Sequence, residues 1–400
     1  MHAAKSSATI AMEAESGSIR YRVLHVGEVV RGGIATYLRS TIPTQRERYG
    51  DDGVLGLYPA EFADDLRDVF LAPRLAPWRK RGPGSLFRFG LAVASAIRDL
   101  NPDLVHAHST FAGFFVRVVM LSMPRKRRPI VVYCAHGWAF LQETRSTKRW
   151  VYAALERLLT PLADGVVHIS QHEARSAAER GIVPAAQVTI YNGLPDKAYP
   201  VKVDGFGEAR KLVLLFAGRR DRQKGLDILF DALRLVKRRD IVLHVVGDAV
   251  ISEGAVPIPA GEDRIVSHGW ASSEEMEALY LQADVVVMPS RWEGFGYVAL
   301  EAMRAGCAVF ASRRGALPEL VVDDVTGRLF DPQRPQDLAR LIDGAEIGDL
   351  KRMGQRGRTL FVSQFSADSS NDSLLRFYDS LVSSQLSRGL TPLTRRPVKA

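Results

Sequence analysis

Short apolar runs rich in β-branched residues alternate with helix-like segments along most of this 400-residue chain. Such alternation is typical of parallel sheets covered by helices. A first series of strand-like runs starts at residues 21, 53, 104, 130, 165 and 188, and a second at 212, 241, 264, 284 and 308. A stretch with Gly and Pro, from Asn192 to Arg210, separates the two series. The sequence therefore predicts two doubly wound α/β domains rather than one sheet.

The predicted domain boundaries follow from this division. We expect a first domain over residues 19–200 and a second over residues 201–365. Residues 1–18 are small and polar, residues 388–400 are basic and contain Pro, and both are predicted to be disordered tails. The segment between them, residues 366–387, is predicted to be a helix with one apolar face formed by Leu374, Leu375, Tyr378, Leu381 and Val382.

Composition is that of a globular protein, with 25% charged and 46% hydrophobic residues. No apolar run approaches the roughly 18–20 residues that a membrane helix needs, and the first residues lack a signal-peptide core. Cys134 and Cys307 lie in apolar runs without metal-ligand spacing, which predicts buried, reduced thiols. The expected location is the cytoplasm.

The formal net charge of +9 is concentrated in the first half of the chain. Residues 1–200 carry 26 Lys and Arg against 18 Asp and Glu, and Trp78 and Trp150 flank two of the basic clusters. Two interpretations remain: a solvated basic face, or docking on an anionic membrane surface. Nucleic acid is disfavoured because no recognised binding motif accompanies the charge. The clusters are Arg79 to Arg81, Arg125 to Arg128 and Arg145 to Arg149.

The most informative motif is the run SRWEGFGYVALEAMRAGCAVFAS, which begins at Ser290. A buried strand should precede it and a helix ending near Gly306 should follow, so Glu293 falls at the carboxyl end of a strand, where open α/β sheets bind ligands. Glu301 is expected about two turns into the helix, roughly 12 Å farther along. Two carboxylates so spaced can hold two separate polyhydroxyl groups, but they are too far apart to act as an acid/base pair on one bond. A solvated helix face is the alternative for Glu301.

A second strand-to-helix loop occurs in FAGRRDRQKGLDILFDAL, which starts at Phe216. The strand should end at Gly218 and the helix should begin near Lys224-Gly225, with Arg219 on the loop between them. Two cations at a helix N-terminus form a site for a pyrophosphate, and fixed cations stabilise the charge that develops on a leaving phosphate. The neighbouring Arg220 and Arg222 are expected to be solvated.

A glycine pair follows the first strand. Gly32-Gly33 leads into a helix, which lets the helix N-terminus approach an anion or a hydroxyl-rich ligand, although a simple turn would look the same. The pattern is not G-x-G-x-x-G, which disfavours a nicotinamide or flavin dinucleotide.

Histidines end two strands of the first half. His106 and His108 alternate on one face of an extended chain, and no third metal ligand is evident, so a structural role is favoured over a metal site. His136 follows a buried strand and precedes Gly137, and its neutral imidazole could hydrogen-bond a hydroxyl group.

The motifs at Glu293 to Glu301 and Gly218 to Gly225 resemble the E-x7-E and G-R-x-x-x-x-K-G patterns of the family 4 (group 1) retaining glycosyltransferases. The resemblance covers roughly residues 21–385 and implies a GT-B fold, with two Rossmann-like domains facing across a cleft and the final helix packing back on the first domain. Tyr297 departs from the family, which commonly has a small aliphatic residue there.

The resemblance also implies roles for individual residues. Arg219 and Lys224, next to Gly218, would carry the diphosphate. Glu293 and the Phe295-Gly296-Tyr297 backbone would hold the sugar hydroxyls, and Glu301 the ribose. His136 would contact the sugar near the anomeric centre, and the Gly32-Gly33 loop would cover the donor phosphates.

The implied reaction is transfer of a hexosyl group from a nucleoside diphosphate sugar with retention at the anomeric carbon. The acceptor would be lipid-linked or a saccharide, in polysaccharide or glycolipid assembly at the inner face of a membrane. The sequence has no Asp-x-Asp, so we expect metal-independent chemistry without a cofactor. An epimerase of the same fold, or a non-catalytic sugar- or membrane-binding protein, remains an alternative.

Overall fold

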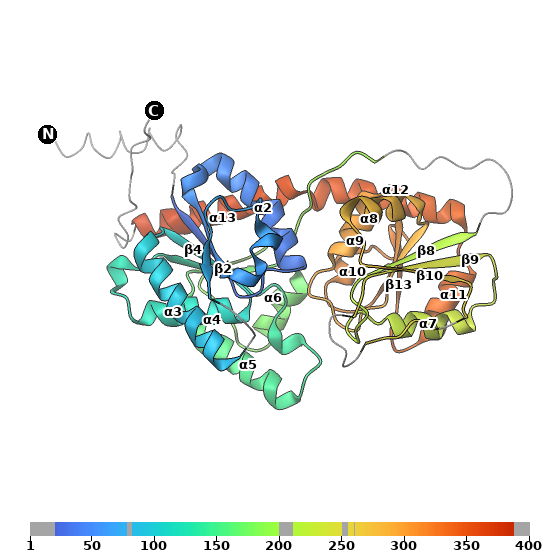
Figure 1. The fold of residues 1–400 in the computed structure, drawn as a ribbon, viewed down its shortest axis with the longest axis horizontal. Coiled ribbons are helices and arrows are strands. Elements are labelled where there is room, and N and C mark those ends of the chain that lie inside the picture. The colour runs from blue at the N-terminus through green and yellow to red at the C-terminus, as the bar shows by residue number, and fades with distance from the viewer. Residues whose placement is uncertain (1–20, 78–81, 200–210, 250–254, 260, 388–400) are drawn as a thin grey trace. The chain divides into compact units, whose positions relative to one another are not determined.

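The computed structural model describes residues 21–77, 82–199, 211–249, 255–259 and 261–387. These residues form two parallel sheets with helices packed on them (Figure 1). The α/β class predicted from the alternating pattern is confirmed. The predicted tails and the basic cluster Arg79 to Arg81 lie outside the described residues.

The first sheet has seven strands in the order β3-β2-β1-β4-β5-β6-β7. Strands β2 and β3 are added on one side of β1, and β4 and the later strands on its other side. β1 and β4 pair in parallel, with Gly27 opposite His108. The carboxyl ends of these two strands therefore lie at one edge of the sheet. The strands are β1 (Val23–Gly27), β2 (Val54–Pro59), β3 (Arg74–Ala76), β4 (Leu104–His108), β5 (Ile130–Cys134), β6 (Gly165–His168) and β7 (Gln187–Thr189).

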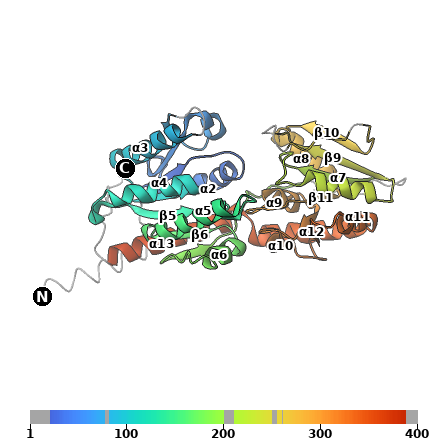
Figure 2. The same cartoon turned by 90° about the horizontal axis from the view of Figure 1, so that it is seen from below.

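The helices that follow these strands are α2 (Gly33–Tyr49), α3 (Pro83–Leu100), α4 (Thr110–Leu121), α5 (Ser146–Leu159) and α6 (Gln171–Ala178). Figure 2 shows α3 beside α4, and the two helices are in contact. Short 3₁₀ turns lie at Asp51–Gly53, Ala60–Phe62, Asp64–Leu66, Arg125–Arg127, Ala139–Leu141 and Thr160–Leu162.

The second sheet has six strands in the order β10-β9-β8-β11-β12-β13. Its strands are β8 (Leu212–Ala217), β9 (Ile241–Val246), β10 (Ile265–Gly269), β11 (Val285–Met288), β12 (Ala308–Ser312) and β13 (Gly327–Phe330). The helices are α7 (Leu226–Leu235), α8 (Ser273–Gln282), α9 (Tyr297–Arg304), α10 (Leu317–Leu320), α11 (Pro335–Asp343), α12 (Ile347–Gln364) and α13 (Ala367–Ser387).

Helices cover both faces of the second sheet. Figure 1 shows α8, α9 and α12 on one face, and α7 and α11 on the other. Strands β11 and β12 are consequently buried along their whole length. This explains why the sequence has continuous apolar runs at these strands instead of alternation between polar and apolar residues.

Two of the observed strands were not predicted from the sequence. β3 has three residues, and β13 is the four-residue segment Gly327–Phe330 at the edge of the second sheet. Segments this short, with an Arg in each, carry neither a period of two nor an apolar run. Their strand conformation is set by pairing with β2 and β12.

The last helix carries the predicted apolar face, and all five residues of that face are buried. The hydroxyl group of Tyr378 hydrogen-bonds the Nδ1 atom of His106. Asp379 accepts a hydrogen bond from Tyr21 at 3.1 Å and forms an ion pair with Arg48 at 2.6 Å. The end of α13 therefore packs on elements of the first sheet.

The chain divides into two compact units. One contains the described residues up to Cys134, Pro161–Val166 and the described residues from Leu374 onward. The other contains Ala135–Thr160 and Val167–Ser373. His136 and the whole Ser290 motif consequently belong to the same unit, whereas Gly32 and Gly33 belong to the other.

A third histidine joins the pair that the sequence analysis considered. Ring nitrogens of His25, His106 and His108 lie within 4.8 Å of one another, so the expectation that no third imidazole was at hand is wrong. His25 is hydrogen-bonded to His108 at 2.9 Å and to Gln45 at 2.7 Å. Burial lowers the pKa of His25 to about 4. These contacts support a structural role, because both nitrogens of His25 are already hydrogen-bonded.

Cys134 and Cys307 are free and buried, as predicted. Among the described residues, no helix combines the length and the apolar character needed to cross a membrane. Arg125, Lys126 and Arg127 are exposed, and Arg128 is partly buried.

Candidate active site

The loop after β8 places two cations before a helix. β8 ends at Ala217 and α7 begins at Leu226, so Lys224 lies two residues before the helix. Gly225 is the N-cap and has a φ of 69°, a conformation that favours glycine. Arg219 hydrogen-bonds Gln223 at 2.8 Å and forms an ion pair with Asp221 at 3.2 Å, and its side chain is 42% exposed. Its guanidinium is thus oriented on the loop but still accessible.

The loop after β11 carries the first glutamate of the motif. β11 ends at Met288, and α9 begins at Tyr297 with Gly296 as its N-cap. Glu301 therefore lies only about one turn into the helix. The expected two turns are wrong because the E-G-F-G segment is a bent loop that precedes the helix instead of forming its first turn.

The two loops meet in an ion pair. The Nζ atom of Lys224 lies 2.7 Å from Oε2 of Glu293, and the Lys224 and Glu293 side chains are only 19% and 9% exposed. Ser290 donates a further hydrogen bond to the same carboxylate oxygen at 3.2 Å. Removing either ionic partner would leave a largely buried charge without compensation. The sequence-predicted cation and carboxylate are therefore brought into direct contact.

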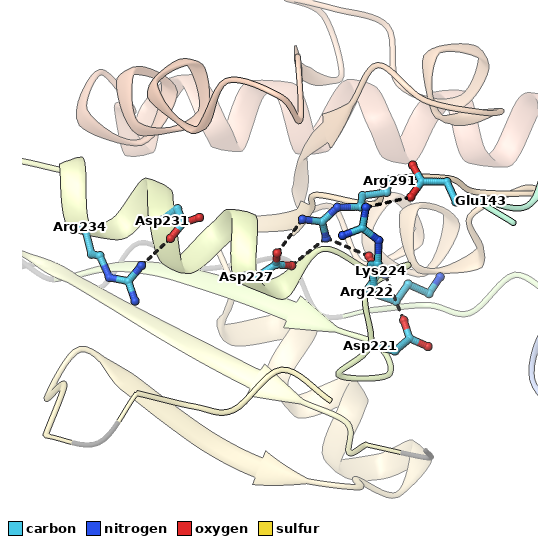
Figure 3. Close-up of polar contacts among 8 residues, drawn as sticks. All are labelled: Glu143, Asp221, Arg222, Lys224, Asp227, Asp231, Arg234 and Arg291. Carbon is cyan, nitrogen blue, oxygen red and sulfur yellow. Dashed lines mark hydrogen bonds and ion pairs between the residues drawn. The ribbon is translucent and has the colours of Figure 1, made fainter. Parts of the chain in front are cut away.

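Backbone packing holds these loops together. A Cβ atom on Gly225 would lie 2.1 Å from the carbonyl oxygen of Pro289, so a side chain there would push the two loops apart. Arg291 extends the connection: its backbone N–H donates to Gln223 at 2.8 Å, and its guanidinium binds Asp227 through two hydrogen bonds (Figure 3). Burial raises the pKa of Asp227, but contact with Arg291 outweighs it, and the pKa lies below its usual value.

The sequence patterns assigned no role to Arg291, Asp227 or Gln223. A signal was nonetheless present, because Arg291 lies inside the glutamate motif and Asp227 lies two residues after Gly225. Only the folded chain shows that these residues bridge the loops.

Glu301 is bound to a neighbouring helix. The hydroxyl of Tyr280 on α8 donates a 2.6 Å hydrogen bond to its carboxylate. Burial raises the pKa of Glu301, against the lowering effects of Tyr280, Arg304 and Lys224. Lys224 is thus electrostatically coupled to both glutamates of the motif.

The aromatic residues and glycines of the predicted site are placed by packing and by helix starts. Phe295 is buried, with its ring centroid 5.7 Å from that of Tyr297 and 6.4 Å from that of Tyr191. Gly218 follows β8, and a Cβ atom there would lie 3.4 Å from the Lys224 side chain. In the other unit, Gly33 begins α2 and Gly32 is its N-cap. The functional roles of these residues remain predictions.

His136 has a left-handed backbone with a φ of 51°. Residues other than glycine rarely adopt this backbone conformation, and such strain is often found at functional sites. Burial lowers the pKa of His136 to about 3, so the imidazole is neutral at ordinary pH. A Cβ atom on Gly294 would lie 3.3 Å from the Cα atom of Gly137. The His136-Gly137 turn therefore packs directly against the loop that carries Glu293.

Glu173 on α6, which was not among the predicted site residues, supports this turn. Its carboxylate accepts a 3.0 Å hydrogen bond from the backbone N–H of Ile169, and the nearby backbone amides of Gly137 and Trp138 favour its charged form. Its carbonyl oxygen accepts the indole N–H of Trp138 at 3.2 Å. Burial raises the pKa of Glu173 to about 7. Ser170-x-x-Glu173 is a helix-capping pattern, which could have located the helix start but not the turn that it supports.

The raised pKa of Glu173 predicts a pH-dependent contribution to stability. Its folded-state pKa exceeds the ordinary value, so its contribution is fully present below about pH 4.5 and is lost as the pH rises through about 7. The melting temperature of Glu173→Gln minus that of wild type should therefore be larger at pH 8 than at pH 5. Thermal unfolding at the two pH values measures this, with the exposed Glu179→Gln as control. An identical pH dependence in wild type and Glu173→Gln would contradict the prediction.

Two basic residues near the site, Arg220 and Arg222, differ in how far their side chains are exposed to solvent. Arg222 is 67% exposed and pairs with Glu143 at 3.3 Å (Figure 3), consistent with the expected solvated residue. Arg220 does not fit that expectation. It pairs with Asp248 after β9, and its side chain is largely buried, because the adjacent strand ends bring the two loops together.

Two family models match successive parts of this chain. The "Glycosyl transferase 4-like domain" matches residues 32–193, and "Glycosyl transferases group 1" matches residues 205–359. The two sheets, the loop geometry and these matches define a glycosyltransferase with the two-domain α/β GT-B fold. More specifically, the chain belongs to the group 1 glycosyltransferases.

Similar proteins match over different lengths. An "Uncharacterized 41.2 kDa protein in cps region" from Klebsiella pneumoniae is 27% identical and covers 90% of this chain and 99% of its own. The lipopolysaccharide 1,2-N-acetylglucosaminetransferase of Salmonella typhimurium is 35% identical over 38% of this chain and 44% of its own. The structure of Anabaena Alr3699/HepE in complex with UDP and glucose has a TM-score of 0.74 and 22% identity, and covers 90% of this chain and 100% of that chain.

Proposed function

We propose that this glycosyltransferase moves a hexosyl group from a nucleoside diphosphate sugar to a lipid-linked or saccharide acceptor, with retention at the anomeric carbon and without a metal ion. The observation that carries the proposal is the contact between Lys224 and Glu293, because it joins a cation at a helix start to a carboxylate at a strand end. A nucleoside diphosphate sugar requires both groups side by side, the cation to bind its diphosphate and the carboxylate to accept hydrogen bonds from its sugar hydroxyl groups.

The comparisons support the donor and acceptor classes by analogy. The solved Alr3699/HepE structures contain UDP, or UDP with glucose, or UDP-glucose. A lipopolysaccharide transferase and a protein from a cps region are among the relatives, which favours polysaccharide or glycolipid assembly for this chain.

In the proposed reaction, an acceptor hydroxyl oxygen forms a bond to the anomeric carbon as the bond from that carbon to the phosphate oxygen breaks. The acceptor proton passes to the leaving diphosphate on the same face of the sugar. Arg219 and Lys224 stabilise the charge that grows on this diphosphate. Glu293 holds sugar hydroxyls, Glu301 the ribose, and neutral His136 hydrogen-bonds near the anomeric centre.

Donor binding and product analysis test the proposal. Thermal shifts with UDP-, GDP-, ADP- and dTDP-sugars should identify a donor, because a ligand that binds the folded state raises its stability. With that donor and a lipid-linked or saccharide acceptor, product should form with the original anomeric configuration, and excess EDTA should leave the rate unchanged.

Other outcomes would replace the proposal. Isomerised sugar from donor alone would indicate an epimerase, and a failure of every donor to stabilise the protein would indicate a non-catalytic role. Loss of activity in EDTA that Mg²⁺ restores would overturn metal independence, and an inverted product would overturn retention.

A further inference from the structure

Helix α5 exposes the apolar face that a helix of a globular protein normally buries. Trp150 and Leu158 are each 72% exposed, Val151 is 47% exposed and Leu155 is 39% exposed. With the exposed Ala154 they recur at intervals of one, three and four residues, which places them on one stripe that covers an arc of about 140° at about 100° per residue. Glu156, on the opposite side, and Leu159, next to the stripe beyond Leu155, are the residues that α5 buries.

The exposed charges of α5 have one sign: at about 100° per residue, Lys148 and Arg157 border the stripe on its two sides, and Arg149 lies farther round the helix. Lys148, Arg149 and Arg157 on α5 are exposed, as is Arg145 at its N-cap. Glu156 is the single carboxylate of the helix, and it is 3% exposed. The accessible surface of α5 is therefore apolar and cationic, which is complementary to a surface that is apolar and anionic.

We propose that α5 docks this enzyme on an anionic lipid surface by inserting the stripe formed by Trp150, Val151, Ala154, Leu155 and Leu158 between the headgroups. Helices with Trp and Leu on one face and Lys or Arg beside them lie in the plane of the membrane interface. A helix of 14 residues is about 21 Å long, which suits lying in the interface but is too short to cross a bilayer.

A second copy of the chain is a poorer occupant of this surface. In a twofold contact the same patch meets itself, so the basic residues beside both stripes would face like charges. The inference rests on the proposed lipid-linked acceptor and extends it, because a docked helix would hold the enzyme at the surface where such an acceptor resides. It also differs from attraction by the basic clusters alone, because it requires the apolar side chains.

Vesicle binding by the full chain tests the proposal. Wild type should sediment with phosphatidylcholine vesicles that contain phosphatidylglycerol, and should bind pure phosphatidylcholine far more weakly. Trp150→Ser/Leu155→Ser/Leu158→Ser should reduce partitioning at least about tenfold, because the inserted apolar area is lost. Lys148→Gln/Arg149→Gln/Arg157→Gln should weaken binding to the anionic vesicles and reduce its dependence on salt.

A matched control removes exposed apolar residues elsewhere. Leu235→Ser/Val322→Ser/Val362→Ser changes three side chains that are 44–48% exposed, and it should bind vesicles like wild type. Trp150 also reports insertion, because its fluorescence should shift to the blue with anionic vesicles and the shift should vanish in Trp150→Phe.

The proposal is overturned if the triple Ser variant on α5 binds as wild type does, or if wild type binds neither vesicle. It is also overturned if light scattering shows a wild-type dimer that the same variant dissociates, because a second copy would then occupy the stripe. Donor stabilisation in detergent-free buffer is measured in parallel. Donor binding without vesicle binding would overturn only the docking proposal. Vesicle binding without stabilisation by any donor would overturn only the proposed glycosyl transfer.

Discussion

Replacing Lys224 or Arg219 with Ala should lower turnover by about 100-fold or more, on the scale of losing one contact to the transition-state charge. Lys224 contacts Glu293 at 2.7 Å, and Arg219 is oriented by Gln223 and Asp221 on the same loop. Both cations are therefore positioned before the leaving diphosphate gains charge. Steady-state rates with the donor identified by thermal shift measure the effect.

Arg222→Ala provides the matched control, because it removes a cation from the same loop that is 67% exposed and pairs with Glu143. It should retain wild-type turnover. Arg219→Ala separates catalysis from folding, since its side chain is accessible and its removal leaves no buried charge. Turnover within about threefold of wild type in both Lys224→Ala and Arg219→Ala would reject their assignment to the diphosphate, because a lost transition-state contact costs far more.

Gly225→Ala should destabilise the protein and weaken donor binding. A left-handed backbone costs a residue with a side chain about 1–2 kcal/mol. The new Cβ atom would also lie 2.1 Å from the carbonyl oxygen of Pro289, and overpacking of this kind costs about 1–3 kcal/mol. The clash would separate the loop of Lys224 from the loop of Glu293. Thermal unfolding and donor affinity measure the two consequences.

Gly261→Ala isolates the backbone contribution. Gly261 has a φ of 73°, close to the 69° of Gly225, but among the described residues no atom beyond its chain neighbours lies within 4 Å of the Cβ position. It should lower stability by the conformational cost alone and leave donor affinity intact. Equal melting temperatures for the two Ala variants would show that the contact with Pro289 is not needed.

The fold class was predictable because buried parallel strands and amphipathic helices leave continuous and periodic apolar patterns. β8 and β12 were found at their first residues, Leu212 and Ala308. The glycine-bearing loops were predictable for a related reason: strand ends and helix starts are marked locally by Gly218, Gly225 and Gly296. By contrast, β3 and β13 have too few residues to carry a pattern, and they form because a neighbouring strand offers backbone partners.

Local sequence thus determined which loops carry charged side chains, and hence that Lys224, Arg219 and Glu293 were candidates. Only the tertiary structure decided which of them touch, because the ion pair between Lys224 and Glu293 joins residues 69 positions apart. The same holds for Glu173, whose carboxylate supports the His136 turn 37 positions before it in the sequence. It holds also for α5, where sequence periodicity predicts an amphipathic helix but not which face is left exposed. Burial and pairing depend on what packs nearby, and a linear pattern does not contain that information.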